Sequence, residues 1–125
     1  MNFRQLSAEL VDAIHDEVLN PGELHGRALD KSLDGALARV ERRLDYGMLN
    51  DVFDLAAAYA MVIATGHCFN DGNKRTAFRA MQTALHLNGI EIPWNAAEIG
   101  PLMIRLAQGQ IDEDDLAAWL RGRAG

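Results

Sequence analysis

The chain has 125 residues, of which 49% are hydrophobic and 24% are charged. This length is typical of one domain, and this composition excludes a chain that is disordered throughout. The formal net charge of −6 at pH 7 disfavours broad binding to nucleic acid, so an anionic ligand requires a local cluster of cations. We therefore expect residues 1–125 to form a single domain that does not bind nucleic acid directly.

Cysteine content and targeting signals indicate the compartment. Cys68 is the only cysteine, which excludes an internal disulfide and a cysteine-based zinc site and fits a reducing environment. The N-terminal segment MNFRQLSAELVDAIHDEVL lacks the apolar stretch of a signal peptide. The longest apolar run, Leu55–Thr65, is shorter than the about 20 helical residues that span a bilayer. We expect a cytoplasmic protein without a membrane segment.

The first part of the chain predicts two amphipathic helices. Apolar residues recur there at helical spacing in two sets: Leu10, Val11, Ile14, Val18 and Leu19, then Leu33, Leu37, Val40 and Leu44. Ser7 is a suitable N-cap for the first helix, which the Asn-Pro-Gly sequence at 20–22 ends. Residues Pro21–Asp30 are expected to form a polar loop, and Tyr46-Gly47 closes the second helix.

A third segment, Val52–Gly66, is apolar on nearly all sides, which predicts a buried central helix with Asp51 as its N-cap. A turn at Asp71-Gly72 follows, and we expect Asn73 to cap a fourth helix. The buried side of that helix is expected to comprise Ala77, Phe78, Met81, Ala84 and Leu85.

The last part of the chain predicts one short extended piece, Ile90–Ile92, and two more helices. The first of these carries Ala96, Ile99, Leu102, Met103 and Leu106. Because Pro101 falls inside this pattern, the helix is either kinked or begins near Gly100. Asp112 caps the final helix. The sequence therefore predicts an all-α protein of about six helices, with an active-site loop between the two central ones.

That loop, His67–Arg75 (HCFNDGNKR), has the features of a phosphate-binding site. The N-terminus of the following helix offers free N–H groups and the positive end of the helix dipole. Lys74 and Arg75 oppose this dipole at a cost of about 0.3–1 kcal/mol each, so a bound polyanion explains them better than an empty helix start. Lysine supplies a point charge, and arginine can hold a phosphate with two hydrogen bonds.

Other residues of the loop supply the remaining parts of a phosphate-transfer site. Asp71 is a carboxylate of the kind that Mg²⁺ takes beside phosphate oxygens, and Gly72 lets the backbone approach a ligand closely. His67 can take a proton from a hydroxyl nucleophile. This combination predicts phosphoryl or nucleotidyl transfer. Phe69, the only large apolar residue in the loop, is expected to anchor it to the core.

A plainer interpretation remains open, in which Asp71–Arg75 is an ordinary turn into a solvated helix and His67 only meets a helix dipole. Cys68 is interpreted as a buried, inert thiol. Two charged clusters, Arg39–Arg43 and Asp112–Asp115, are interpreted as a solvated face and as helix capping. The remaining histidines are interpreted as solvated or locally bonded side chains and not as metal ligands: His15, His25 and His86.

The loop resembles the signature of the Fic family, H-P-F-x-D/E-G-N-G-R, and above all that of its Doc branch, H-x-F-x-D/N-A/G-N-K-R. Residues 67–75 match the Doc form at each defined position. The resemblance implies an all-helical domain in which His67 is the base, Asp71 binds Mg²⁺ and Phe69 is the core anchor. It implies that the phosphate-binding positions are Gly72, Asn73, Lys74 and Arg75.

Lys74 stands where Fic enzymes that transfer AMP have glycine. In the Doc branch this lysine accompanies a reversed nucleotide, which presents its γ-phosphate to the base. The resemblance therefore implies the toxin of a type II toxin–antitoxin pair. Such a toxin transfers the γ-phosphate of ATP, with Mg²⁺, to a threonine of elongation factor Tu and blocks translation. The alternatives are AMP transfer to a protein hydroxyl, and a non-catalytic module that binds a nucleotide or a protein.

Two further expectations concern regulation and substrate. Many Fic proteins restrain themselves with a helix of pattern S/T-x-x-x-E-G/N, and this sequence contains no such pattern. The resemblance instead implies restraint by an antitoxin of the Phd type, whose disordered tail folds onto the toxin. We expect a substrate-docking flap near Tyr46–Asn50.

Overall fold

Six helices dominate the computed structural model, which describes residues 2–124. They are α1 (Ala8–Val18), α2 (Leu33–Asp45), α3 (Val52–Gly66), α4 (Asn73–Leu87), α5 (Ala96–Ala107) and α6 (Glu113–Arg123). The described residues contain no strand, and none of these helices is long and apolar enough to cross a membrane. The all-α prediction is confirmed.

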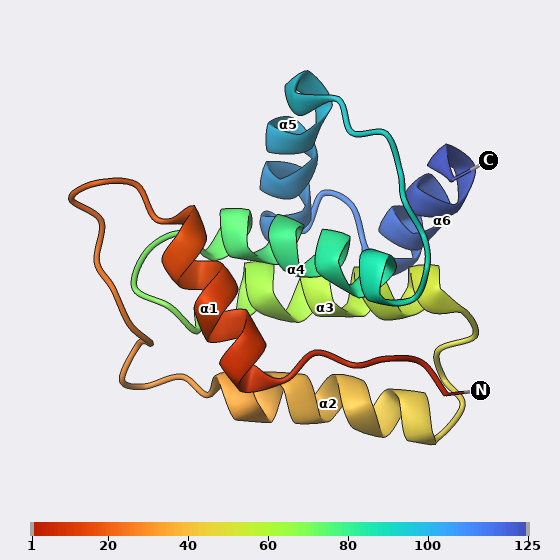
Figure 1. Cartoon of the computed structure of the whole chain (residues 1–125), viewed down its shortest axis with the longest axis horizontal. Helices are drawn as coiled ribbons and strands as arrows, with labels where there is room; N and C mark the ends of the chain where they lie inside the picture. Colours follow the sequence, from red (N-terminus) through yellow and green to blue (C-terminus); the bar gives the residue numbers. More distant parts are fainter. Residues whose placement is uncertain (1, 125) are drawn as a thin grey trace.

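α3 is the central helix and packs against α2, α4, α5 and α6 (Figure 1). Small side chains let the neighbouring helices approach it closely, and five of them are at most 2% exposed: Ala56, Ala57, Ala58, Ala60 and Ala64. Tyr59 is also buried, and its hydroxyl accepts a hydrogen bond from the backbone N–H of Leu6 at 3.0 Å. The prediction of a buried central helix is therefore confirmed.

The helix starts differ in one respect that matters for the site. Five helices begin with a side chain that accepts a backbone N–H of the first turn: Ser7, Ser32, Asp51, Asn95 and Asp112. The N-cap position of α4 is Gly72, whose φ of +76° favours glycine and which provides no side-chain cap. The prediction that Asn73 caps α4 is wrong, because Asn73 is the first residue of the helix.

The structure decides between the alternatives left open for the region after α4. Ile90–Ile92 forms no named strand, and the N–H of Ile90 donates to the carbonyl of Leu85, which closes α4. α5 begins at Ala96 rather than near Gly100, because Asn95 caps it there. Pro101 consequently lies inside the helix, where it supplies no N–H to the turn before it.

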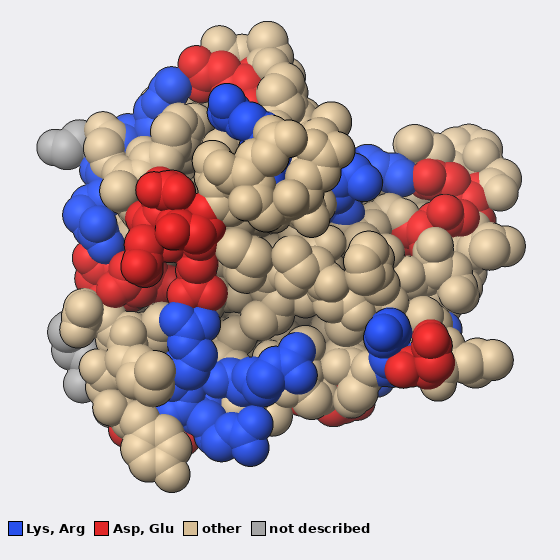
Figure 2. All heavy atoms as spheres, turned by 180° about the vertical axis from the view of Figure 1, so that it is seen from behind, with Lys and Arg blue, Asp and Glu red and all other residues tan. Residues whose placement is uncertain are grey.

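The charged clusters of α2 and α6 bind each other. Acidic side chains adjoin basic ones on the face shown in Figure 2. Arg43 donates two hydrogen bonds to Glu113, at 2.9 and 2.5 Å. Arg121 pairs with Asp51 and Asp54. The interpretation of Arg39–Arg43 as a solvated face is therefore wrong for Arg43, which holds α2 against α6.

The long loop that joins α1 to α2, residues 19–32, lies beside the loop that joins α3 to α4 (Figure 1). The N–H of Ala28 donates to the carbonyl of Cys68 at 2.8 Å, and an isolated β-bridge pairs Arg27 with Phe69. Arg27 also binds the carboxylates of Asp12 and Asp34. Tyr46–Asn50 precedes α3 and lies at its other end, so the segment beside the motif is 19–32 and not the expected one.

Candidate active site

His67 sits directly after α3 in a left-handed backbone conformation, with φ 51° and ψ 39°. Among the described residues it is the only one other than glycine with positive φ. Histidine tolerates this region at a cost of order 1 kcal/mol, and such strain is concentrated at functional positions. The turn leaves the imidazole exposed at the start of the motif loop, where it can reach a ligand.

Phe69 anchors the loop as predicted, with 2% of its surface exposed. Asn73 fastens the backbone around it, because its Oδ1 accepts from the N–H of Phe69 at 3.1 Å and its Nδ2 donates to the carbonyl of Phe69 at 2.9 Å. The side chain of Asn73 is thus engaged within the loop. Its main-chain N–H is the part that faces the open end of α4.

His15 of α1 supports the same loop from the core side. It is 1% exposed, and its ring stacks on that of Phe69 with centroids 3.9 Å apart and planes 9° from parallel. Its Nε2 lies 2.7 Å from the carbonyl oxygen of Asp71, so that nitrogen carries the proton. The interpretation of His15 as a solvated or locally bonded histidine is wrong. It shares the buried face of α1 with Val11 and Ile14, a signal present in the sequence.

The first turn of α4 is open to an anion. The N–H groups of Asn73, Lys74 and Arg75 donate no hydrogen bond among the described residues, whereas that of Thr76 donates to Gly72 at 2.9 Å. Unpaired N–H groups at a helix start, with the positive end of the dipole, form an anion site. The first turn also carries no acidic residue.

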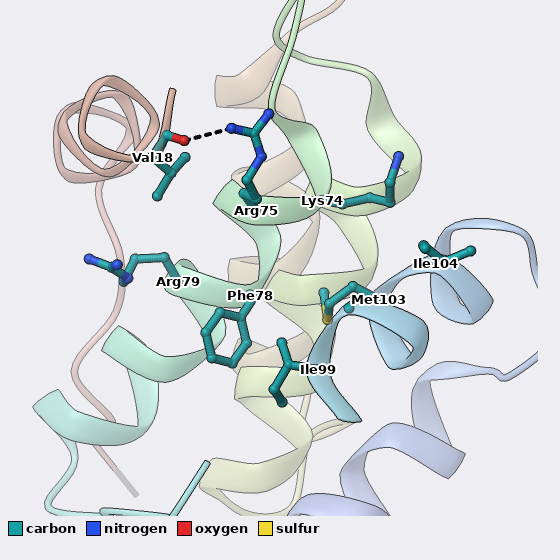
Figure 3. Close-up of a pocket in the computed structure, with 9 residues that line it drawn as sticks. Val18, Lys74, Arg75, Phe78, Arg79, Ile99, Met103 and Ile104 are labelled. Carbon is teal, nitrogen blue, oxygen red and sulfur yellow. Dashed lines mark hydrogen bonds between the residues drawn. The ribbon is translucent and has the colours of Figure 1, made fainter. Parts of the chain in front are cut away.

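The two cations of this turn point in different directions (Figure 3). Lys74 is exposed and forms no ion pair in the part of the chain that the structure describes. Arg75 points toward α1, where its Nη1 donates to the carbonyl of Val18 and to Glu23, both at 2.7 Å. Its Nη2 donates to Glu23 at 2.5 Å. The whole charged group of Lys74 is therefore available to a ligand, whereas both terminal nitrogens of Arg75 already donate to Val18 or Glu23.

Arg75 and Glu23 stabilise each other's charged forms. The hydrogen bonds from Arg75 lower the pKa of Glu23, and the hydrogen bonds to Glu23 raise the pKa of Arg75. Arg75 keeps its Nε–H and one N–H of Nη2 without a partner among the described residues. A phosphate can use these two groups while Glu23 stays in place.

Asp71 is the only carboxylate of the loop and is half-buried. Its Oδ2 accepts the N–H of Leu24 at 2.8 Å, and its Oδ1 has no hydrogen bond among the described residues. No three His, Cys, Asp or Glu side chains within residues 2–124 lie close enough together to hold a metal. The donor set therefore fits a Mg²⁺ ion that takes one carboxylate and fills its other positions with phosphate oxygens and water. It does not fit a metal held by the protein alone.

A groove of about 400 Å³ runs from Lys74 and Arg75 along α4 toward α5 (Figure 3). Apolar side chains form most of its wall: Val18, Phe78, Ile99, Met103 and Ile104. Arg79 adds a third cation at its edge. The groove is therefore cationic at the start of α4 and mostly apolar along the rest of its wall.

The structure brings together most of the residues that the sequence singled out. His67, Asp71, Gly72 and the N–H groups at the start of α4 share one loop with Phe69 beneath it. Cys68 is 2% exposed, and burial raises the pKa of its thiol, which agrees with an inert role. Sequence reasoning missed His15 and Glu23. The polar loop that contains Glu23 has no sequence pattern that predicts its ion pair with Arg75.

Fold and loop together define a class of all-helical protein in which a loop between two central helices leads into an uncapped helix start. The chain belongs to the Fic/DOC family, which residues 5–85 match. It is similar to "Protein kinase doc" of Escherichia phage P1, with 33% identity over 120 residues that cover 95% of this chain and 94% of that protein. It is also similar to "Toxin Doc" of Mycolicibacterium smegmatis, with 38% identity over 96 residues that cover 74% and 73%. The resemblance to the Doc branch is confirmed.

Proposed function

We propose that the protein is a toxin that transfers the γ-phosphate of ATP to a threonine hydroxyl of a protein substrate. The observation that carries the proposal is the uncapped start of α4, where Lys74 and three N–H groups have no partner among residues 2–124. The names of the two relatives support the two parts of the proposal, since one is called a protein kinase and the other a toxin.

The candidate site residues of the loop have distinct roles in this reaction. The N–H groups of Asn73, Lys74 and Arg75 and the Nζ of Lys74 bind the phosphates and stabilise their charge. His67 accepts the proton of the attacking hydroxyl at its ring nitrogen. Asp71 would hold Mg²⁺, and the ion would supply charge neutralisation to the phosphate oxygens. Phe69 and His15 keep the loop in this shape.

We propose elongation factor Tu as the substrate, so that the transfer blocks translation in the cytoplasm. The support is the match of residues 67–75 to the Doc pattern, including lysine at position 74. The same match supports an antitoxin of the Phd type as partner. The groove beside the site suits a partner segment with apolar and acidic side chains, because its wall is apolar and Lys74, Arg75 and Arg79 line it.

AMP transfer is the second candidate, because a phosphate site of this kind accepts a nucleotide in either direction. The experiment incubates the protein with Mg²⁺, elongation factor Tu and ATP labelled at the α- or the γ-phosphate. Label from the γ-phosphate alone supports the kinase, and label from the α-phosphate replaces it with AMP transfer. If neither label is transferred and His67→Ala stays as toxic in cells as the wild type, the enzymatic proposal is lost.

A further inference from the structure

Glu23 lies outside the motif, yet it contacts the side chain of one motif residue directly. Its two carboxylate oxygens accept hydrogen bonds from Nη1 and Nη2 of Arg75, at 2.7 and 2.5 Å. Such a bidentate pair fixes the plane of the guanidinium as well as its position. The carboxylate of Glu23 is itself held in place, because the N–H of Asn20 donates to its Oε1 at 2.6 Å. Glu23 therefore sets where the remaining N–H groups of Arg75 point.

The peptide bond that follows Glu23 contacts a second motif residue. Its N–H, that of Leu24, donates to Oδ2 of Asp71 at 2.8 Å. This contact leaves Oδ1 of Asp71 as the oxygen available to a ligand. One residue thus orients two charged groups of the site, the first through its side chain and the second through its peptide bond.

Apolar packing does not hold this part of the loop. Leu24 is 62% exposed, and Leu29 is fully exposed. Polar contacts therefore keep residues 19–32 against the motif, namely those of the Glu23 and Arg27 side chains and of the N–H groups of Leu24 and Ala28. Of these two side chains, Arg27 reaches Asp12 and Asp34, whereas Glu23 reaches the motif itself.

We propose that Glu23 is a positioning residue of the active site, which aligns Arg75 for phosphate and Asp71 for the metal. This inference rests on the proposed function, because it assumes that these two groups bind the phosphates and Mg²⁺ of ATP. Glu23 touches neither ligand and acts through Arg75 and the Leu24 amide.

The test compares wild type with Glu23→Gln, which keeps the shape of the side chain and removes its charge. We expect the dissociation constant for ATP, measured by calorimetry with and without Mg²⁺, to rise about tenfold. In the phosphate-transfer assay, KM for ATP rises by a similar factor and kcat changes less. By NMR, the Leu24 amide exchanges with solvent about fivefold faster or more, and the carboxyl carbon of Asp71 shifts.

Glu17→Gln is the matched control, because Glu17 pairs only with the exposed Arg79 at 3.7 Å and should leave every readout unchanged. Glu23→Asp keeps the charge on a shorter arm and should raise the dissociation constant by a smaller factor. If Glu23→Gln does not fold, Glu23→Asp replaces it in the test. A dissociation constant for ATP equal to that of the wild type then overturns the proposal.

An ATP affinity of Glu23→Gln equal to that of the wild type overturns the inference, as does an unchanged Leu24 amide. A tighter affinity also overturns it, since the carboxylate then competes with phosphate for Arg75. Failure of the proposed function looks different. Either the label is transferred from the α-phosphate while Glu23→Gln still weakens ATP binding, or wild type itself binds no ATP while the NMR changes at Leu24 and Asp71 still test the alignment.

Discussion

The imidazole of His15 lies flat on the ring of Phe69, with 3.9 Å between centroids, and its Nε2 bonds the carbonyl of Asp71 at 2.7 Å. α1 thereby supports both the buried anchor of the motif loop and the backbone of its acidic residue. The two contacts reach across 54 and 56 positions of sequence. The shape of the loop consequently depends on a helix that carries none of the motif.

Replacing His15 with alanine removes the stack and the hydrogen bond together. Because the site is fully buried, we expect a loss of about 2–4 kcal/mol in the free energy of unfolding, measured by urea denaturation. ATP affinity should fall as well, since the loop loses its support. His86→Ala, at an exposed histidine, should stay within about 0.5 kcal/mol of wild type. Equal effects of the two variants contradict this account.

The left-handed conformation at position 67 favours glycine for stability, whereas the proposed reaction needs histidine as the base. Glycine adopts this conformation without strain, so His67→Gly should be about 1 kcal/mol more stable than His67→Ala. Both variants lose the base, and transfer activity should fall by about 100-fold or more in each. The check pairs denaturation curves with single-turnover rates. A glycine variant no more stable than the alanine variant shows that the backbone is unstrained.

Lys74 opposes the dipole of α4 and has no ion-pair partner in the part of the chain that the structure describes, so its removal should stabilise the fold and weaken ATP binding. We expect Lys74→Ala to gain about 0.3–1 kcal/mol in the free energy of unfolding. Its dissociation constant for ATP should rise about tenfold or more, and less so at high salt. Lys31→Ala removes an exposed cation outside the motif and should do neither. A destabilised Lys74→Ala protein with wild-type affinity excludes Lys74 from the phosphate site.

The ion pair of Glu23 and Arg75 predicts an acid-dependent loss of stability. Arg75 lowers the pKa of Glu23 from its ordinary value of 4.5, so the folded state binds this proton less readily than the unfolded state. The contribution is complete above that ordinary value and is lost as the pH falls through the folded pKa. Denaturation between about pH 3 and about pH 6 should show a steeper decline for wild type than for Glu23→Gln. If the free energy of unfolding falls equally with pH in both proteins, this ion pair does not contribute to acid denaturation.

Cys68 should be unreactive in the folded protein. Its side chain is 2% exposed, and burial raises the pKa of the thiol, which lowers the amount of reactive thiolate. Iodoacetamide should therefore modify the protein rapidly in urea and slowly without it, as followed by mass spectrometry. Cys68→Ser should retain transfer activity. Fast modification under native conditions, or loss of activity in the serine variant, would assign the thiol a part in the reaction.

The sequence alone determined the helices, three of the caps and which chemical groups the loop contains. Those properties depend on residues that are close along the chain. A segment that is apolar on nearly all sides predicts the buried helix α3, and Ser7, Asp51 and Asp112 each accept from an N–H three positions later. His67, Asp71 and Lys74 lie within one motif, so their neighbourhood needs no tertiary information.

Only the tertiary structure decided how that motif is held and which of its groups stay free. Asn73 forms hydrogen bonds with the backbone of Phe69 instead of capping α4, and Arg75 forms an ion pair with Glu23. His15 reaches the loop from a helix more than 50 positions away. The physical reason is that a side chain's hydrogen-bond partner depends on the relative placement of packed elements, and local sequence does not encode that placement. The open start of α4, with Lys74 unpaired beside it, follows from this packing.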